Sequence, residues 1–181
     1  MLEFAILGLL HEAPMHGYEL RKRLHGLLGA FRAFSYGTLY PALRRLQRDG
    51  LIVEEAPGEE ERSWGRRTRK VYRLTAEGKE RFGELLADAG PQTWDDDSFG
   101  VHLAFFSRTP AEVRVRILEG RRRRVEERRE GLRSSLAETG ERIDRYTREL
   151  HRMGLESSER EVRWLNELIA HEQAELGERD E

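Results

Sequence analysis

The segment from 35 to 50 separates apolar from basic positions more clearly than any other part of the chain. At about 100° per residue, two leucines fall within about 40° of a third on a helical wheel, so the three form one ridge. They are Leu39, Leu43 and Leu46. Arg44 and Arg48 fall on the opposite side. With Ser35 as N-cap and Gly50 as stop signal, the pattern predicts a helix whose leucine ridge packs inward and whose arginines face solvent.

Further helices are expected on both sides of this segment. Residues 1 to 12 are apolar nearly all round and end before Pro14, which predicts a buried helix. Residues 16 to 28 carry leucines at helical spacing on one side and basic residues on the other, which predicts a partly solvated helix. Thr75 is a suitable N-cap for a helix that extends to about residue 89.

Two short segments, 51–55 and 69–74, have the composition and alternation of strands. The loop between them is charged and is broken by Pro57 and Gly58, so it is expected to be a long, solvated hairpin tip. The order is helix, helix, helix, strand, loop, strand, helix. This order predicts a winged helix-turn-helix.

The second half of the chain has a helical pattern with few breakers. Thr109 and Pro110 suit a helix start, and no strong breaker follows until Gly154, which predicts one or two long helices. Ser158 and Glu161 have the spacing of a capping box, so a last helix is expected to begin there.

The expected fold class is mostly α with a small β-hairpin wing. A winged helix-turn-helix DNA-binding domain is expected at 1–90, a linker with a short helix at 91–109, and an antiparallel long-helix dimerisation domain at 110–181. The long helices have narrow apolar seams, so each needs the other and a second chain to bury them. The residues expected at the dimer contact are Leu132, Leu136, Ile143, Tyr146, Leu150, Leu165, Leu168 and Ile169.

The composition narrows the class of protein. The chain has 181 residues, 36% of them charged, and no cysteine, which excludes disulfides and thiolate metal sites and fits a reducing compartment, the cytoplasm. The apolar start lacks a basic leader and a cleavage site, so neither a signal peptide nor a membrane span is expected. The net charge is only −2, yet residues 21–81 hold 15 Lys and Arg against 8 Asp and Glu. Positive charge is therefore concentrated in the winged-helix half.

Several separated sequence blocks occur in the order and spacing of a known family. They are HGYEL at 16–20, GTLYPAL at 37–43, RL at 45–46, GLI at 50–52 and RKVYRLT at 69–75, with Gly78. The chain resembles the PadR family of bacterial transcriptional regulators over roughly residues 1 to 88, and its helical part is similar to the longer, virulence-activator-like branch. The resemblance implies a homodimeric repressor or activator on a near-palindromic operator, which a small molecule or cellular signal can release.

Two elements of the expected domain are suited to contact double-stranded DNA. The start of the third helix presents hydroxyl groups, its outer face presents guanidinium groups, and the wing presents cations for a phosphate or minor-groove clamp. Alternatives remain for each: Ser35 can be only a cap, the tyrosines can pack in the core, and the arginines can form an ordinary solvated face. The expected DNA-binding residues are Ser35, Tyr36, Thr38, Tyr40, Arg44, Arg48, Arg66, Arg67, Arg69 and Lys70.

Two other groups of residues have less specific patterns. Aromatic residues near the linker can line an effector pocket or can simply pack between domains or subunits; they are Trp94, Phe99, Phe105 and Phe106. Arg121 to Arg124 lie among glutamates and cover all sides of a helix, so a solvated surface with ion pairs is expected there.

No constellation for catalysis, metal or cofactor binding is visible. The six histidines have no ligand spacing, and no phosphate-binding loop or nucleophile elbow occurs. The expected function is therefore a regulator without cofactor or enzymatic activity that binds double-stranded DNA as a homodimer. The alternative is a winged-helix protein-interaction scaffold that does not bind DNA.

Overall fold

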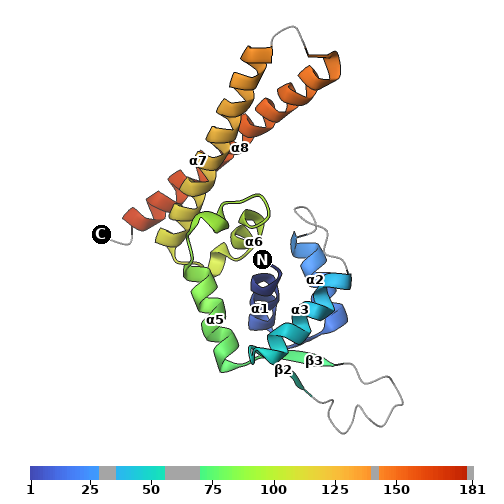
Figure 1. Cartoon of the computed structure of the whole chain (residues 1–181). Coiled ribbons are helices and arrows are strands. Elements are labelled where there is room, and N and C mark those ends of the chain that lie inside the picture. Colours follow the sequence, from blue (N-terminus) through green and yellow to red (C-terminus); the bar gives the residue numbers. More distant parts are fainter. Residues whose placement is uncertain (29–35, 56–69, 140–142, 179–181) are drawn as a thin grey trace. The chain divides into compact units, whose positions relative to one another are not determined.

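The computed structural model describes residues 1–28, 36–55, 70–139 and 143–178 (Figure 1). The chain divides into two compact units. The N-terminal unit comprises Met1–Asp88 and Gly100–Thr109, and the C-terminal unit comprises Ala89–Phe99 and Pro110–Glu181. The segment 91–109, expected as a linker, therefore contributes residues to both units.

The N-terminal unit combines helices with one small antiparallel sheet. Its helices are α1 (Leu2–Glu12), α2 (Gly17–Leu28), α3 (Tyr36–Arg48) and α5 (Ala76–Ala87), followed by most of α6 (Phe99–Ala104) and the 3-10 turn η2 (Phe106–Arg108). Its strands are β1 (Met15–His16), β2 (Ile52–Glu55) and β3 (Val71–Leu74), in the order β1-β3-β2. The arrangement confirms the winged helix-turn-helix. The first strand was not expected from the sequence.

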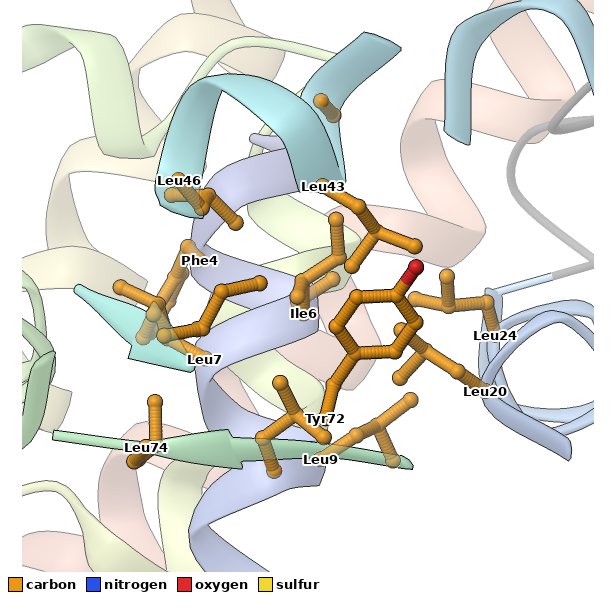
Figure 2. Packing of buried hydrophobic residues seen from close by; sticks show 14 of the residues in the cluster. Phe4, Ile6, Leu7, Leu9, Leu20, Leu24, Leu43, Leu46, Tyr72 and Leu74 are labelled. Atoms are coloured by element: carbon orange, nitrogen blue, oxygen red, sulfur yellow. The ribbon is translucent and has the colours of Figure 1, made fainter. Parts of the chain in front are cut away.

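Helix α1 is the centre of this unit's core. Its residues from Phe4 to Leu10 are all buried, which explains why the helix is apolar on every side. Figure 2 shows Leu43 and Leu46 of α3 and Leu20 of α2 directed toward α1, with two side chains of β3 closing the cluster. The leucine ridge of α3 is therefore part of the core, as the sequence predicted.

The turn from α3 into the sheet is fastened to the start of α5. Gly50 has φ of 74°, a conformation that favours glycine, and its carbonyl accepts a hydrogen bond of 2.7 Å from the Thr75 hydroxyl. The same hydroxyl oxygen accepts from the Gly78 amide at 3.0 Å, which confirms Thr75 as the N-cap. A Cβ at position 78 would lie 2.0 Å from the Leu51 carbonyl oxygen, so only glycine permits this approach.

The C-terminal unit is built on two long antiparallel helices, α7 (Ala111–Thr139) and α8 (Arg145–Gly177), after a short turn η1 (Pro91–Thr93). The expectation of a break at Gly154 and a new helix at Ser158 is wrong. Asp144 caps α8 by accepting from the amides of Tyr146 and Thr147, at 2.8 and 3.1 Å, so the helix starts earlier. Gly154 lies inside α8 because an isolated glycine costs a packed helix only about 1 kcal/mol.

The apolar residues of α7 and α8 are unevenly buried. Ile117, Leu118 and Val125 of α7 are buried, as are three residues of α8: Val162, Leu165 and Ile169. Leu165 and Ile169, expected at a dimer contact, thus pack within the chain's own helix pair. Leu132, Leu136, Ile143 and Leu168 are half-buried. In contrast, Tyr146 is 82% exposed, and Leu150 and Met153 are also exposed.

Arg121 is not part of a solvated surface, and that expectation is wrong for this residue. Its side chain is only 7% exposed. The guanidinium donates to Asp96 Oδ1 at 2.6 Å, to Glu161 Oε1 at 2.7 Å and to the Trp94 carbonyl at 2.9 Å. These three acceptors compensate the burial of the charge and tie the segment before α6 to both long helices. Arg123 and Arg124 are exposed, as expected.

Candidate nucleic-acid interface

Helix α3 presents opposite chemistry on its two sides. Leu39, Leu43 and Leu46 are buried, whereas Arg44 and Arg48 are exposed. The exposed side also carries Gly37, Thr38, Tyr40 and Pro41. The buried ridge fixes the rotation of the helix about its axis, so the two arginines are held toward solvent on one face.

The arginines of α3 differ in their partners. Arg45, on the flank of the helix, pairs with Glu3 of α1 at 3.6 Å. Neither Arg44 nor Arg48 has a carboxylate partner among the residues that the structure describes. A guanidinium without an internal acid keeps its charge and its donors available to an external anion. Arg44 and Arg48 therefore form the basic centre of this face.

Tyr40 is both packed and accessible. Its side chain is 43% exposed. A Cβ at Gly17 would lie 3.4 Å from a carbon of the Tyr40 ring and 3.5 Å from a carbon of the Tyr72 ring, so both rings lie against the start of α2. Burial raises the pKa of Tyr72, and Glu54 raises it further, while Arg44 opposes the shift. The Tyr72 side chain is thus neutral, and its ring packs beside Tyr40 under the exposed side of α3.

Lys70, expected to contact DNA, is paired with a carboxylate of the sheet. Its ammonium donates to Glu54 Oε2 at 2.9 Å across the hairpin, and this hydrogen bond and charge raise the pKa of Lys70. Gln47 of α3 approaches the same oxygen at 3.5 Å. The charge of Lys70 is therefore compensated within the sheet.

Several of the expected DNA-binding residues cannot be placed. Ser35, Arg66, Arg67 and Arg69 lie outside the described residues, and only the backbone of Tyr36 is described. Thr38 is exposed at the start of α3. The contacts expected from the wing stay predictions.

Helix α2 has a basic side, as the sequence predicted, but Tyr18 was not expected to lie on it. Tyr18 is 67% exposed, and the guanidinium carbon of Arg21 lies 5.3 Å from the centre of its ring. The available signal was the spacing of positions 18, 21, 22 and 25, which share one helical face.

The four aromatic residues considered for an effector pocket are divided between the two units. In the N-terminal unit, Phe105 is buried against Phe4 and Phe82, with ring centres 5.2 and 5.7 Å away, and Phe106 is half-buried. In the C-terminal unit, Phe99 packs edge-on against Trp164 at 6.2 Å. The Trp94 indole donates to the Ala89 carbonyl at 3.3 Å. Packing thus gives Trp94, Phe99 and Phe105 a role within the protein, and a ligand role stays a prediction.

The described residues contain neither a group of metal ligands nor a helix suited to a membrane. Within 1–28, 36–55, 70–139 and 143–178, no group of three His, Cys, Asp or Glu side chains is close enough to hold a metal ion. His102 is a core residue: it stacks on Phe4 at 4.8 Å, and burial lowers its pKa to about 4. In the same part of the chain, no helix is long and apolar enough to span a bilayer.

The fold and the α3 face together define a winged helix-turn-helix domain with a basic third helix. The model of the transcriptional regulator PadR-like family matches residues 6–84 of this chain. The match confirms the resemblance seen in the sequence. The C-terminal helices lie beyond the matched region.

Two characterised relatives are similar to the same part of the chain. The negative transcriptional regulator PadR of Bacillus subtilis is 29% identical over 86 residues, which are 48% of this chain and 45% of the relative. The transcriptional regulator Rv3488 of Mycobacterium tuberculosis is 42% identical over 78 residues, 40% of this chain and 64% of the relative. This chain thus matches less than two thirds of either relative. Neither name denotes an enzyme, in agreement with the expectation from the sequence.

A solved structure is similar over more of the chain. The crystal structure of Bacillus subtilis PadR in complex with operator DNA covers 94% of this chain and 98% of its own, with 22% sequence identity and a TM-score of 0.44.

Proposed function

We propose that this protein is a sequence-specific DNA-binding transcriptional regulator, acting as a repressor in the bacterial cytoplasm. The observation that carries the proposal is the pair of exposed arginines on α3, Arg44 and Arg48, which have no carboxylate partner in the described residues and lie one helical turn apart. A helix of this kind fits the major groove, with its basic side on phosphates or guanine edges. Repression is the activity named for the Bacillus subtilis relative.

We propose that the protein acts as a homodimer on a near-palindromic operator. The support is a stripe on α8 of Tyr146, Leu150 and Met153, three large apolar side chains exposed at helical spacing. A shallow, open hollow lies over this stripe and is lined also by Glu149, Arg152 and Glu156. Exposed stripes of this kind mark contact surfaces, and a second copy of the chain would bury it. Two copies would present two α3 helices to successive major grooves about one DNA turn apart.

The DNA-binding proposal is tested by fluorescence anisotropy with full-length protein. The probe is a duplex selected by the protein from a random pool. Replacing both Arg44 and Arg48 by Ala is expected to weaken binding about 100-fold, at about 1.4 kcal/mol for each charge-assisted contact. Arg45→Ala is the matched control, because it removes the same charge from the same helix at a position paired with Glu3.

The outcomes separate the proposal from its alternative. Full affinity in the double variant would contradict the proposed role of α3. A wild-type chain that selects no sequence would favour the winged-helix protein-interaction scaffold instead.

The homodimer proposal is tested by sedimentation of the full chain. Wild-type protein is expected at twice the 21.2 kDa chain mass at micromolar concentration. Leu150→Glu is expected to shift it to monomer, because it places a charge in the stripe that the dimer would bury. The control is Gln173→Glu, which adds the same charge at another exposed position of α8. Monomeric wild-type protein would contradict the homodimer without affecting the DNA-binding test.

A further inference from the structure

A single carboxylate of α1 contacts arginines of two other helices. Glu3 lies in the first turn of α1, which packs against both α3 and α5. Its Oε1 accepts a hydrogen bond of 3.2 Å from Arg81 Nε on α5, and its Oε2 lies 3.6 Å from Arg45 Nη2 on α3. The two oxygens of Glu3 are thus divided between two guanidinium groups.

The position of this carboxylate is fixed by its surroundings. The Glu3 side chain is only 25% exposed, and every residue from Phe4 to Leu10, directly after it, is buried in the core. Because a close-packed core resists displacement of a buried helix, Glu3 stays beside the last turn of α3. The hydrogen bond from Arg81 orients the carboxylate further.

Arg45 lies on the flank of the face that carries the other two arginines of α3. At about 100° per residue, it is about 60° from Arg48 and about 100° from Arg44 around the helix axis. Its side chain is 53% exposed. A guanidinium in this position is close enough to the α3 face to bind a phosphate beside the groove, and Glu3 competes with phosphate for its donors.

We propose that Glu3 is a positioning residue that limits sequence-independent binding of DNA by holding the Arg45 guanidinium away from phosphate. This inference rests on the proposed DNA-binding function. Phosphate contacts add affinity for any sequence, so a third available arginine on α3 would strengthen binding to the many competing sites in a genome. In the described part of the chain, Glu3 restricts the arginines of α3 without a carboxylate partner to Arg44 and Arg48.

The second arginine that contacts Glu3 is not expected to become available when Glu3 is lost. Arg81 Nη1 also donates to Glu84 Oε2 at 2.9 Å, within α5. This second partner keeps the charge of Arg81 compensated after removal of Glu3. Arg45 has no second carboxylate partner among the described residues. Loss of Glu3 therefore acts on Arg45 more than on Arg81.

The test measures the affinity of the full-length protein for a random-sequence duplex by fluorescence anisotropy at several salt concentrations. Glu3→Gln removes the negative charge with little change of shape. It is expected to tighten binding about fivefold for each chain bound and to steepen the slope of log K against log salt by about 0.9, the value for one phosphate contact. A purely structural role of Glu3 would not add to this slope.

The decisive variant combines Glu3→Gln with Arg45→Ala. If the gain comes from the released guanidinium, this double variant returns to the affinity and slope of the wild type. Arg45→Ala alone is expected to change affinity by less than about twofold, since its charge is already paired in the wild type. A gain that persists in the double variant would overturn the assignment to Arg45.

The matched control is Glu84→Gln, which changes the net charge by the same amount and removes the other partner of Arg81. Its affinity is expected to stay within about twofold of wild type, because Arg45 keeps Glu3. An equal gain in this control would indicate a general charge effect and overturn the proposal. Ion pairs near the surface contribute little to stability, so thermal unfolding should find every variant folded at the assay temperature.

The outcomes distinguish this inference from the function on which it rests. Suppose that the Arg44 and Arg48 double variant loses affinity but Glu3→Gln keeps the affinity and salt slope of the wild type. Glu3 then does not restrain Arg45, and the regulator proposal stands. If the wild-type chain binds no DNA, both proposals fail together.

Discussion

Two groups of arginines in this protein have the same side chain and different surroundings. On α3, Arg44 and Arg48 are exposed and have no carboxylate partner in the described part of the chain. On α7, Arg121 is buried and donates to Asp96, Glu161 and a backbone carbonyl. The guanidinium groups of Arg44 and Arg48 can bind an external anion, whereas the hydrogen bonds of Arg121 stabilise the fold.

The comparison teaches that local charge density is a poor guide to nucleic-acid binding. Positions 121–124 are four consecutive arginines, the densest basic run in the sequence. Yet the run includes a buried structural residue, and Arg128, one turn further on, bridges the same two acids at 3.1 and 3.2 Å. The two arginines of α3 are fewer but lie opposite a buried ridge. Internal carboxylates decide which guanidinium groups can act on a partner.

The largest expected effect is on stability. Arg121→Ala leaves Glu161 without its buried partner and removes the donor to the Trp94 carbonyl. The loss of three hydrogen bonds from a buried guanidinium is expected to lower the free energy of unfolding of the full chain by about 2 to 4 kcal/mol, while Arg128 stays paired with both acids. Chemical denaturation followed by circular dichroism measures it.

The control for that variant is Arg124→Ala. Arg124 is exposed and lies 3.8 Å from an exposed Asp95, so its loss is expected to change stability by less than about 0.5 kcal/mol. Equal effects of the two variants would contradict the division between structural and solvated arginines in this run.

The next largest effect is expected at Gly120, whose missing side chain leaves space for the Trp94 ring beside Arg121. A Cβ at Gly120 would lie 2.2 Å from the Trp94 ring, so Gly120→Ala must displace the indole and with it the carbonyl that accepts from Arg121. We expect a loss of about 1 to 3 kcal/mol in the free energy of unfolding. Gly131→Ala is the matched control, because nothing lies within 4 Å of a Cβ there. It is expected to stabilise α7 by about 0.5 to 1 kcal/mol; a gain at both positions would contradict the close approach of Trp94.

Local patterns in the sequence were sufficient for the winged-helix part of the fold. The Leu39, Leu43 and Leu46 ridge fixed which side of α3 is buried, and Thr75 was identified as a cap because capping depends on neighbouring residues. Strand β1 was missed because it has two residues, and its strand conformation comes from pairing Met15 with Tyr72, far along the chain.

The surroundings of Arg121 could not be predicted for a related reason. Its partners Asp96 and Glu161 are 25 and 40 positions away in sequence, and only tertiary packing brings them together. In the same way, the start of α8 was misplaced because Gly154 and Ser158 offered stronger local signals than Asp144. The shared face of Tyr18 and Arg21 was visible in the spacing, but the exposure of the Tyr18 ring was not.

A smaller effect, on DNA affinity, is expected when Arg44 and Arg48 of α3 are replaced by lysine. Lysine keeps the charge of arginine and loses its planar fork. If Arg44 and Arg48 bind phosphates, replacing both by Lys should change the Kd of full-length protein for its selected duplex by less than about threefold. If either binds guanine, the fork is required and about 1 to 3 kcal/mol of base discrimination is lost. Anisotropy on the selected duplex and on single-base variants of it separates these cases.

The smallest expected effect is a pH dependence at Asp96. Burial raises the pKa of this carboxyl, but hydrogen bonds and charge from Arg121 and Arg128 outweigh it, so the pKa is lowered from 3.8. A lowered folded-state pKa means that the contribution to stability is present above about pH 4 and is lost as pH falls through the folded pKa. Because the Asp96 side chain is 68% exposed, solvent screens the interaction and the contribution is expected to stay below about 0.5 kcal/mol.

Denaturation of wild type and Asp96→Asn between pH 2 and 7 measures the contribution of Asp96 to the free energy of unfolding, since both proteins share every other titrating group. The difference in unfolding free energy should be constant above about pH 4.5 and shrink below it. A difference that grows toward low pH would mean that Asp96 is protonated more easily in the folded chain. The network around Arg121 would then be held by Glu161 and the Trp94 carbonyl alone, and the contrast with the unpartnered arginines of α3 would rest on burial and on one carboxylate rather than two.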